Sequence, residues 1–137
     1  LTGVDRKLQE KVRRALDLTR DNERLILNVA FNYGGRAEIL HAVREMLADG
    51  IKPEALNESL FSSYLFTKGL PDPDLVIRTS GELRISNFLI WQAAYAEYYP
   101  TPALWPDFGR RDLYEAIVAF NQRDRRFGLV TDTTPQS

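Results

Sequence analysis

Cysteine is absent from this 137-residue chain, and histidine and methionine occur only once each. The absence of cysteine excludes disulfide bonds, thiolate metal sites and a thiol nucleophile, and it fits a reducing compartment. The single histidine, His41, leaves no histidine-containing metal cluster or catalytic triad to assemble. We therefore expect His41 to serve packing or to lie at the surface.

Long hydrophobic runs and an excess of one charge are also absent. No window approaches the roughly 18 apolar residues of a membrane helix, and signal-peptide features are missing. Eighteen basic residues against nineteen acidic ones give a net charge of −1. Nothing global favours nucleic acid, so any anion site has to be local. Because the chain opens on Leu1 and its one methionine is Met46, we expect it to be the back part of a longer protein.

Hydrophobic periodicity predicts helices that alternate with short strands. Helical spacing favours helices over residues 5–20, 37–47, from Lys52 onward, and 111–124. Apolar, β-branched runs favour strands at 24–31, 75–77 and 96–99, and residues 87–94 fit either a helix or a tight apolar segment. This alternation predicts an α/β fold with a parallel-sheet core flanked by helices. Three strands are few for a sheet covered on both faces, so further strands would have to precede Leu1.

Two predictions concern burial within these elements. The run at 24–31 is too apolar for a strand with one solvated face, so we expect it to be covered on both faces. The last helix should turn one apolar face inward, made of Leu113, Ala116, Ile117 and Phe120.

Polar and charged residues gather directly after the predicted strand 75–77. They are Arg78, Thr79, Ser80, Gly81, Glu82, Arg84 and Ser86. Ligands of open parallel sheets bind beyond the carboxyl ends of the strands, and a guanidinium offers forked donors that fit phosphate. Gly81 would allow a close approach of the backbone or a positive φ. The stretch predicts a phosphate site; the alternative is a solvated loop whose arginines pair with nearby acids (Asp72, Asp74 and Glu82).

A second, weaker anion signal is the pair Gly34–Gly35, which opens the predicted helix 37–47. A glycine turn at the start of a helix can aim backbone N–H groups and the positive end of the helix dipole at an anion. A bare Gly-Gly pair is weak evidence, and a plain turn is the preferred interpretation.

Several motifs in order resemble the cis-prenyltransferase family, that is, undecaprenyl diphosphate synthase-like isoprenyl transferases. The strongest is residues 74–92, DLVIRTSGELRISNFLIWQ. Residues 27–36 (LNVAFNYGGR), 94–97 (AYAE) and 104–108 (LWPDF) resemble further blocks of the same family. The resemblance runs from about residue 8 to residue 128. It implies one domain over residues 1–128, the C-terminal part of a larger cis-prenyltransferase fold. The mostly polar residues that follow, 129–137, are expected to form a disordered tail.

The resemblance implies a reaction that condenses isopentenyl diphosphate with an allylic diphosphate such as farnesyl diphosphate, with Mg²⁺ as cofactor. Residues of the arginine loop would bind isopentenyl diphosphate: Arg78, Arg84, Ile85 and Ser86. Glu97 resembles the acid that contributes to the Mg²⁺ site, and an ordinary carboxylate at a strand end is the alternative. Glu82 would orient the arginines. Asn87 would pack behind the loop.

The C-terminal motif with Arg126 and Gly128 resembles one that reaches across the family's dimer to the partner's diphosphate. A basic helix end favoured by the helix dipole is the equal alternative. The resemblance further implies a homodimer in the cytoplasm, with peripheral membrane association through the lipid product and no nucleic-acid partner.

One departure from the family pattern is large. The N-terminal Asp-Gly-Asn-Gly-Arg-like loop, which binds the allylic diphosphate, does not occur in this sequence, so no catalytic residue is assigned here. The rival hypothesis is a non-catalytic partner subunit of a heteromeric prenyltransferase. A generic phosphate-binding α/β domain explains the loop but not the other motifs. Retention of the two loop arginines, Ser86 and Glu97 favours an enzyme.

Overall fold

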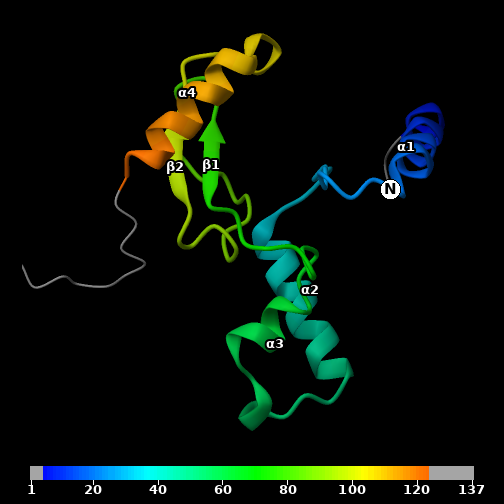
Figure 1. Cartoon of the computed structure of the whole chain (residues 1–137). Helices are drawn as coiled ribbons and strands as arrows, with labels where there is room; N and C mark the ends of the chain where they lie inside the picture. The colour runs from blue at the N-terminus through cyan, green and yellow to red at the C-terminus, as the bar shows by residue number, and fades with distance from the viewer. Residues whose placement is uncertain (1–4, 124–137) are drawn as a thin grey trace, which may run out of the picture. The chain divides into compact units, whose positions relative to one another are not determined.

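A computed structural model describes residues 5–123 of the chain, and the chain divides into two compact units between Asn32 and Tyr33. The first unit contains helix α1 (Arg6–Thr19; Figure 1), which confirms the helix predicted over residues 5–20. Asp5 caps α1 by accepting a hydrogen bond from the Lys7 amide at 2.8 Å. None of the residues of α1 is buried, so its apolar stripe is open to solvent.

The strand predicted at residues 24–31 is wrong for this structure. The segment has no regular secondary structure, and its large apolar side chains are 58–81% exposed: Leu25, Ile26, Leu27, Val29 and Phe31. A strand needs a neighbour that pairs with its backbone N–H and C=O groups. In the part of the chain that the structure describes, the two assigned strands pair only with each other.

The second unit begins with helix α2 (Gly35–Ala48), whose end is marked by Gly50 with a φ of +67°. A 3₁₀ turn, η1 (Pro53–Ala55), leads to the short helix α3 (Glu58–Ser62). Four buried residues join α2 to the α3 segment in a small core: Ala42, Met46, Phe61 and Leu65. Trp91 packs on this core and its ring lies 4.6 Å from that of Phe61.

Two parallel strands form the sheet: β1 (Leu75–Arg78) and β2 (Glu97–Pro100). In their register Leu75 lies opposite Glu97 and Arg78 lies opposite Pro100. The parallel pairing confirms the predicted fold class. The residues of β1 are only partly buried, in contrast to the buried strand that its apolar sequence predicts.

Residues 87–94 connect to β2 through turns, without a helix. This matches the second of the two interpretations, a tight segment, and it buries Gln92 and Ala93.

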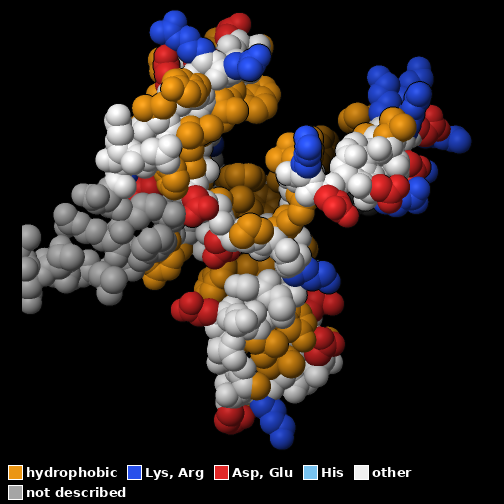
Figure 2. All heavy atoms as spheres, viewed as in Figure 1, with side chains coloured by type: hydrophobic (Ala, Val, Ile, Leu, Met, Phe, Trp, Pro, Cys, Tyr) orange, Lys and Arg blue, Asp and Glu red, His pale blue; other side chains and the backbone are white. Residues whose placement is uncertain are grey.

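Helix α4 (Arg110–Asn121) follows a second 3₁₀ turn, η2 (Trp105–Asp107), and packs on β2. Asp112 accepts a hydrogen bond from the Gly109 amide at 2.8 Å and so closes the start of α4. Of the predicted apolar face only Ala116 is buried, while Leu113 and Ile117 are more than 40% exposed. Figure 2 shows many hydrophobic side chains open at the surface of the molecule. The predicted inward face of this helix is therefore confirmed at Ala116 and wrong at Leu113 and Ile117.

Within residues 5–123, no helix is both long enough and apolar enough to cross a membrane.

Candidate functional site

The arginine loop, residues 79–88, begins where β1 ends, and backbone hydrogen bonds fix its first residues. The amides of Ser80 and Gly81 donate to the carbonyls of Ala103 and Thr101 at 2.9 and 2.8 Å. Gly81 has a φ of +66° and Ser80 a φ of +63°, which confirms that the chain needs positive φ at this turn. The loop therefore starts from a defined position at the carboxyl end of a parallel strand.

Four side chains of the loop and the strand end form one polar cluster. The Nη2 atom of Arg78 lies 3.5 Å from Glu82 Oε2 and 3.4 Å from Ser86 Oγ. Arg84 Nη2 donates to Oε1 of the same glutamate at 3.1 Å, and Arg84 Nε forms an ion pair with its Oε2 at 2.8 Å. The structure thus brings three predicted substrate-binding residues together around Glu82, whose predicted role is to orient the arginines.

The cluster has the charge and the donors of an anion site. Two guanidinium groups face one carboxylate, and arginine keeps its charge at any physiological pH. The Arg78 side chain is 26% exposed and that of Arg84 72% exposed, so one arginine is anchored and the other is open to solvent. Among the described residues, the buried Nε of Arg78 has no hydrogen-bond partner. A buried donor without a partner is unfavourable, and an anionic ligand could satisfy it.

The remaining predicted loop residue, Ile85, is 38% exposed, and its carbonyl accepts a hydrogen bond from the Phe88 amide at 3.0 Å. Arg126 and Gly128, the predicted contacts across a dimer, lie outside the described residues. The predicted tail at 129–137 lies outside them too.

Glu97 is at the first position of β2 and not beside the arginine cluster. Its register partner is Leu75, three residues before Arg78, which is about 10 Å along the strand direction. Its carboxylate Oε2 pairs with Nη1 of Arg123 at 2.6 Å. No group of three or more His, Asp or Glu side chains that could hold a metal gathers within residues 5–123.

A single carboxylate still suits one kind of Mg²⁺ site. Magnesium is commonly held by one or two carboxylates, with substrate phosphates and water as its other ligands. Glu97 fits that pattern as one ligand, provided that the ion pair with Arg123 opens or that the second carboxylate oxygen is used.

The Gly34–Gly35 turn is occupied by another part of the chain. The Gly35 amide donates to the Asn87 carbonyl at 2.8 Å, and the Arg36 amide donates to Asn87 Oδ1 at 2.9 Å. These N–H groups belong to the first turn of α2, where the helix supplies no acceptor. The plain-turn interpretation is therefore the one the structure supports, since two of the amides that an anion would use bind Asn87.

A buried carboxylate, Glu38, was not predicted from the sequence. It is 1% exposed and accepts hydrogen bonds from the Tyr33 hydroxyl, from the Phe66 amide at 2.8 Å and from Gln92 Nε2 at 3.1 and 3.2 Å. Gln92 also donates to Thr67 at 2.9 Å. Burial, together with the hydrogen bond to Glu38, raises the pKa of Tyr33 well above its usual value. The sequence signal was its spacing, since Glu38 precedes the buried Ala42 and Met46 at four-residue intervals.

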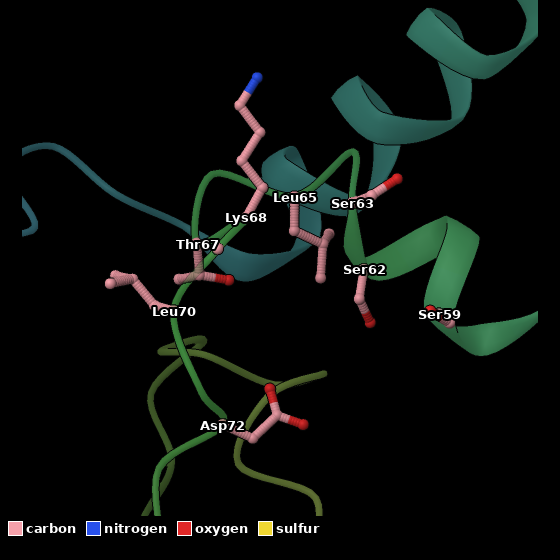
Figure 3. A pocket seen from close by; sticks show the side chains of 9 residues that line it. Ser59, Ser62, Ser63, Leu65, Thr67, Lys68, Leu70 and Asp72 are labelled. Atoms are coloured by element: carbon pink, nitrogen blue, oxygen red, sulfur yellow. The ribbon is translucent and has the colours of Figure 1, made fainter.

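A small pocket of about 190 Å³ lies apart from the arginine loop (Figure 3). All of its lining residues fall within 59–72, and they include three serines, Thr67, Lys68 and Asp72. In Figure 3 the Lys68 side chain points away from Asp72. The pocket contains none of the predicted site residues.

Comparisons with known proteins identify the family of the chain. The profile of the family described as "Putative undecaprenyl diphosphate synthase" matches residues 1–128. The isoprenyl transferase of Heliobacterium mobile is 53% identical over 134 residues, which are 95% of this chain and 50% of that protein. The isoprenyl transferase of Fusobacterium nucleatum is 53% identical over 128 residues, 93% of this chain and 54% of that protein. The chain spans about half the length of the curated relatives it matches.

Two solved structures are also similar. One is lavandulyl diphosphate synthase from Lavandula x intermedia, in complex with dimethylallyl diphosphate, with a TM-score of 0.86 at 38% identity. The match covers 93% of this chain and 57% of the lavender protein. The other is a probable undecaprenyl diphosphate synthase from Campylobacter jejuni, with a TM-score of 0.76 at 33% identity. The match covers 94% of this chain and 60% of the Campylobacter protein. On sequence and on fold, this chain belongs to the undecaprenyl diphosphate synthase family of isoprenyl transferases.

Proposed function

We propose that the chain carries the isopentenyl diphosphate site of a cis-prenyltransferase. In that reaction isopentenyl diphosphate is joined to an allylic diphosphate such as farnesyl diphosphate. A carbon–carbon bond forms, the carbon–oxygen bond to the allylic diphosphate breaks so that diphosphate leaves, and the isopentenyl unit loses a proton as the new cis double bond forms. The observation that carries the proposal is the cluster of Arg78, Arg84 and Ser86 around Glu82 at the carboxyl end of β1.

Each side chain of the cluster has a part in binding. Arg78 and Arg84 supply charge-assisted, forked donors to the diphosphate oxygens, and Ser86 supplies a hydroxyl. Glu82 holds both guanidinium groups within one small area before the ligand arrives, which lowers the entropy lost on binding. The unpaired Nε of Arg78 gives the diphosphate a donor that no described residue uses.

Glu97 is the residue of this chain that would hold Mg²⁺. When bound, Mg²⁺ neutralises charge on the diphosphate as it leaves. The hard carboxylate oxygens of Glu97 suit that ion, and Arg123 keeps one of them paired in this structure.

The rest of the enzyme is proposed from the relatives. The chain matches only about half the length of those proteins, so the allylic site is proposed to lie mainly on sequence that this chain does not contain. The lavender structure holds dimethylallyl diphosphate, an allylic diphosphate, which supports diphosphate chemistry on this fold. We further propose a homodimer that works in the cytoplasm beside the membrane receiving its lipid product.

Incorporation of radiolabelled isopentenyl diphosphate tests the proposal. The chain is assayed with farnesyl diphosphate and Mg²⁺, alone and mixed with the remaining segment of a family member. We expect product only in the mixture, and we expect Arg78→Ala and Arg84→Ala each to reduce it at limiting isopentenyl diphosphate. A mixture that is folded but inactive, with a chain that does not bind isopentenyl diphosphate, would favour the non-catalytic partner subunit instead.

A further inference from the structure

Asn87 joins the arginine loop to the start of helix α2, although the two are far apart in sequence. Its carbonyl accepts from the Gly35 amide at 2.8 Å, and its side-chain Oδ1 accepts from the Arg36 amide at 2.9 Å. The first amides of a helix have no partner within the helix, and an Asn oxygen is among the best acceptors for them. Asn87 therefore caps α2, although it lies 51 residues after Arg36 in the sequence.

The contact leaves little room for a Cβ atom on the α2 side, most of all at Gly35. A Cβ atom on Gly35 would lie 2.8 Å from Ile90 Cγ1 and 3.2 Å from the Asn87 carbonyl oxygen. A Cβ atom on Gly34 would lie 2.9 Å from Asn87 Nδ2. The Gly-Gly pair lets the two backbones approach each other, and this explains a motif that the proposed reaction leaves unused.

The same contact bears on the loop conformation next to it. Ser86 and Asn87 have φ values of +50° and +61°, so two consecutive non-glycine residues are left-handed. That conformation is unfavourable for a residue with a side chain, and asparagine tolerates it better than serine does. In it, the Ser86 hydroxyl lies 3.4 Å from Nη2 of Arg78. The two hydrogen bonds from α2 to Asn87 oppose relaxation of this turn.

We propose that Asn87 is a positioning residue for the diphosphate site, a role that rests on the proposed function. By capping α2, Asn87 holds the left-handed turn that places Ser86 beside Arg78. Its Oδ1 accepts from the Arg36 amide, and the role we assign to Asn87 is exerted through Ser86.

The test compares three variants by isothermal titration of the chain with isopentenyl diphosphate. Asn87→Ala removes the side-chain acceptor. Asn87→Gly removes it as well but adopts positive φ freely, so it keeps the fold even where alanine strains the turn. Asn57→Ala is the matched control, because Asn57 caps α3 by accepting from the Leu60 amide at the same 2.9 Å and lies outside the arginine loop.

Both Asn87 variants should bind isopentenyl diphosphate about fivefold more weakly. The free energy typically lost with a helix cap, when it appears in full in the binding free energy, corresponds to roughly that change in affinity. In both, hydrogen exchange of the Arg36 amide should speed up, while Asn57→Ala should bind like the wild type. Wild-type affinity in both Asn87 variants would overturn the inference, as would a loss in the alanine variant that glycine restores. A wild-type chain that fails to bind isopentenyl diphosphate would instead remove the proposed function, and this inference with it.

Discussion

Glu97 at the start of β2 and Arg123 just beyond α4 form an ion pair of 2.6 Å between Oε2 and Nη1. Their side chains are 28% and 38% exposed, so the pair is partly shielded from water. It ties the end of α4 to the first residue of β2. It also holds the one carboxylate of the chain to which we assign a magnesium role.

A double-mutant cycle with Glu97→Gln and Arg123→Gln should give a coupling energy of about 0.5–1 kcal/mol, because a partly shielded pair is at the upper end for surface ion pairs. Denaturant unfolding of the four proteins measures it. The pair Arg111–Glu115 on α4, with a similar 2.8 Å distance but greater exposure, should give a smaller coupling. A coupling at Glu97–Arg123 no larger than that control would contradict the account.

Replacing Glu82 separates two roles for this carboxylate. If Glu82 orients Arg78 and Arg84, Glu82→Ala should weaken isopentenyl diphosphate binding by about tenfold, because two guanidinium groups lose their common partner. If it merely competes with the ligand, removing the negative charge should tighten binding. Titration calorimetry distinguishes the two signs. Glu115→Ala, which frees Arg111 on α4, is the matched control and should leave affinity unchanged.

Tyr33 makes the free energy of unfolding depend on pH in the alkaline range. Because burial and Glu38 raise the pKa of Tyr33 in the folded chain, the unfolded chain loses this proton first, near the usual pKa of about 10. The contribution of Tyr33 is therefore fully present below that pH. It is lost progressively as pH rises beyond it toward the folded pKa.

The measurement is the free energy of unfolding from pH 8 to 11 for the wild type and for Tyr33→Phe. The wild type should lose stability faster than the variant above about pH 10, where the free tyrosine titrates. Parallel curves over this range would show that Tyr33 does not keep its proton in the folded chain.

Gly35→Ala should destabilise the chain by about 1–3 kcal/mol, as overpacking commonly does, because the new methyl group meets Ile90 and the Asn87 backbone at 2.8 and 3.2 Å. Thermal or denaturant unfolding measures the loss. Gly109→Ala is the control, since its nearest neighbours are 3.9 Å away. Equal stability of the two variants would mean that the loop and α2 do not pack as closely as described.

Local patterns predicted the elements on which the site is built. The apolar spacing within residues 37–47 predicts a helix, and the run 75–77 followed by Arg78 predicts a strand that leads into a basic loop. Both predictions depend on neighbours in sequence, and both are confirmed by α2 and β1. Arg78, Arg84 and Ser86 lie close together in the sequence, so their clustering in the structure could be predicted from the same stretch.

Relationships between distant segments could not be read in this way. The segment 24–31 has the composition of a strand, but pairing depends on a neighbouring strand that the described chain does not supply. The register that places Glu97 opposite Leu75, and the cap that Asn87 gives α2, both depend on tertiary packing. Asn87 carried one sequence signal, because asparagine is both a good cap and tolerant of positive φ.

Direct binding of isopentenyl diphosphate to the chain tests the central claim, that the arginine loop is the diphosphate site. Isothermal titration of the wild type, Arg84→Ala and Arg111→Ala compares two arginines whose Nε atoms lie 2.8 Å from a glutamate oxygen, only one of them in the loop. We predict binding by the wild type and by Arg111→Ala, and affinity lower by about tenfold to a hundredfold in Arg84→Ala, the loss of a charge-assisted contact. Equal affinity in all three proteins, or binding by none of them, would contradict the claim that the arginine loop is the diphosphate site.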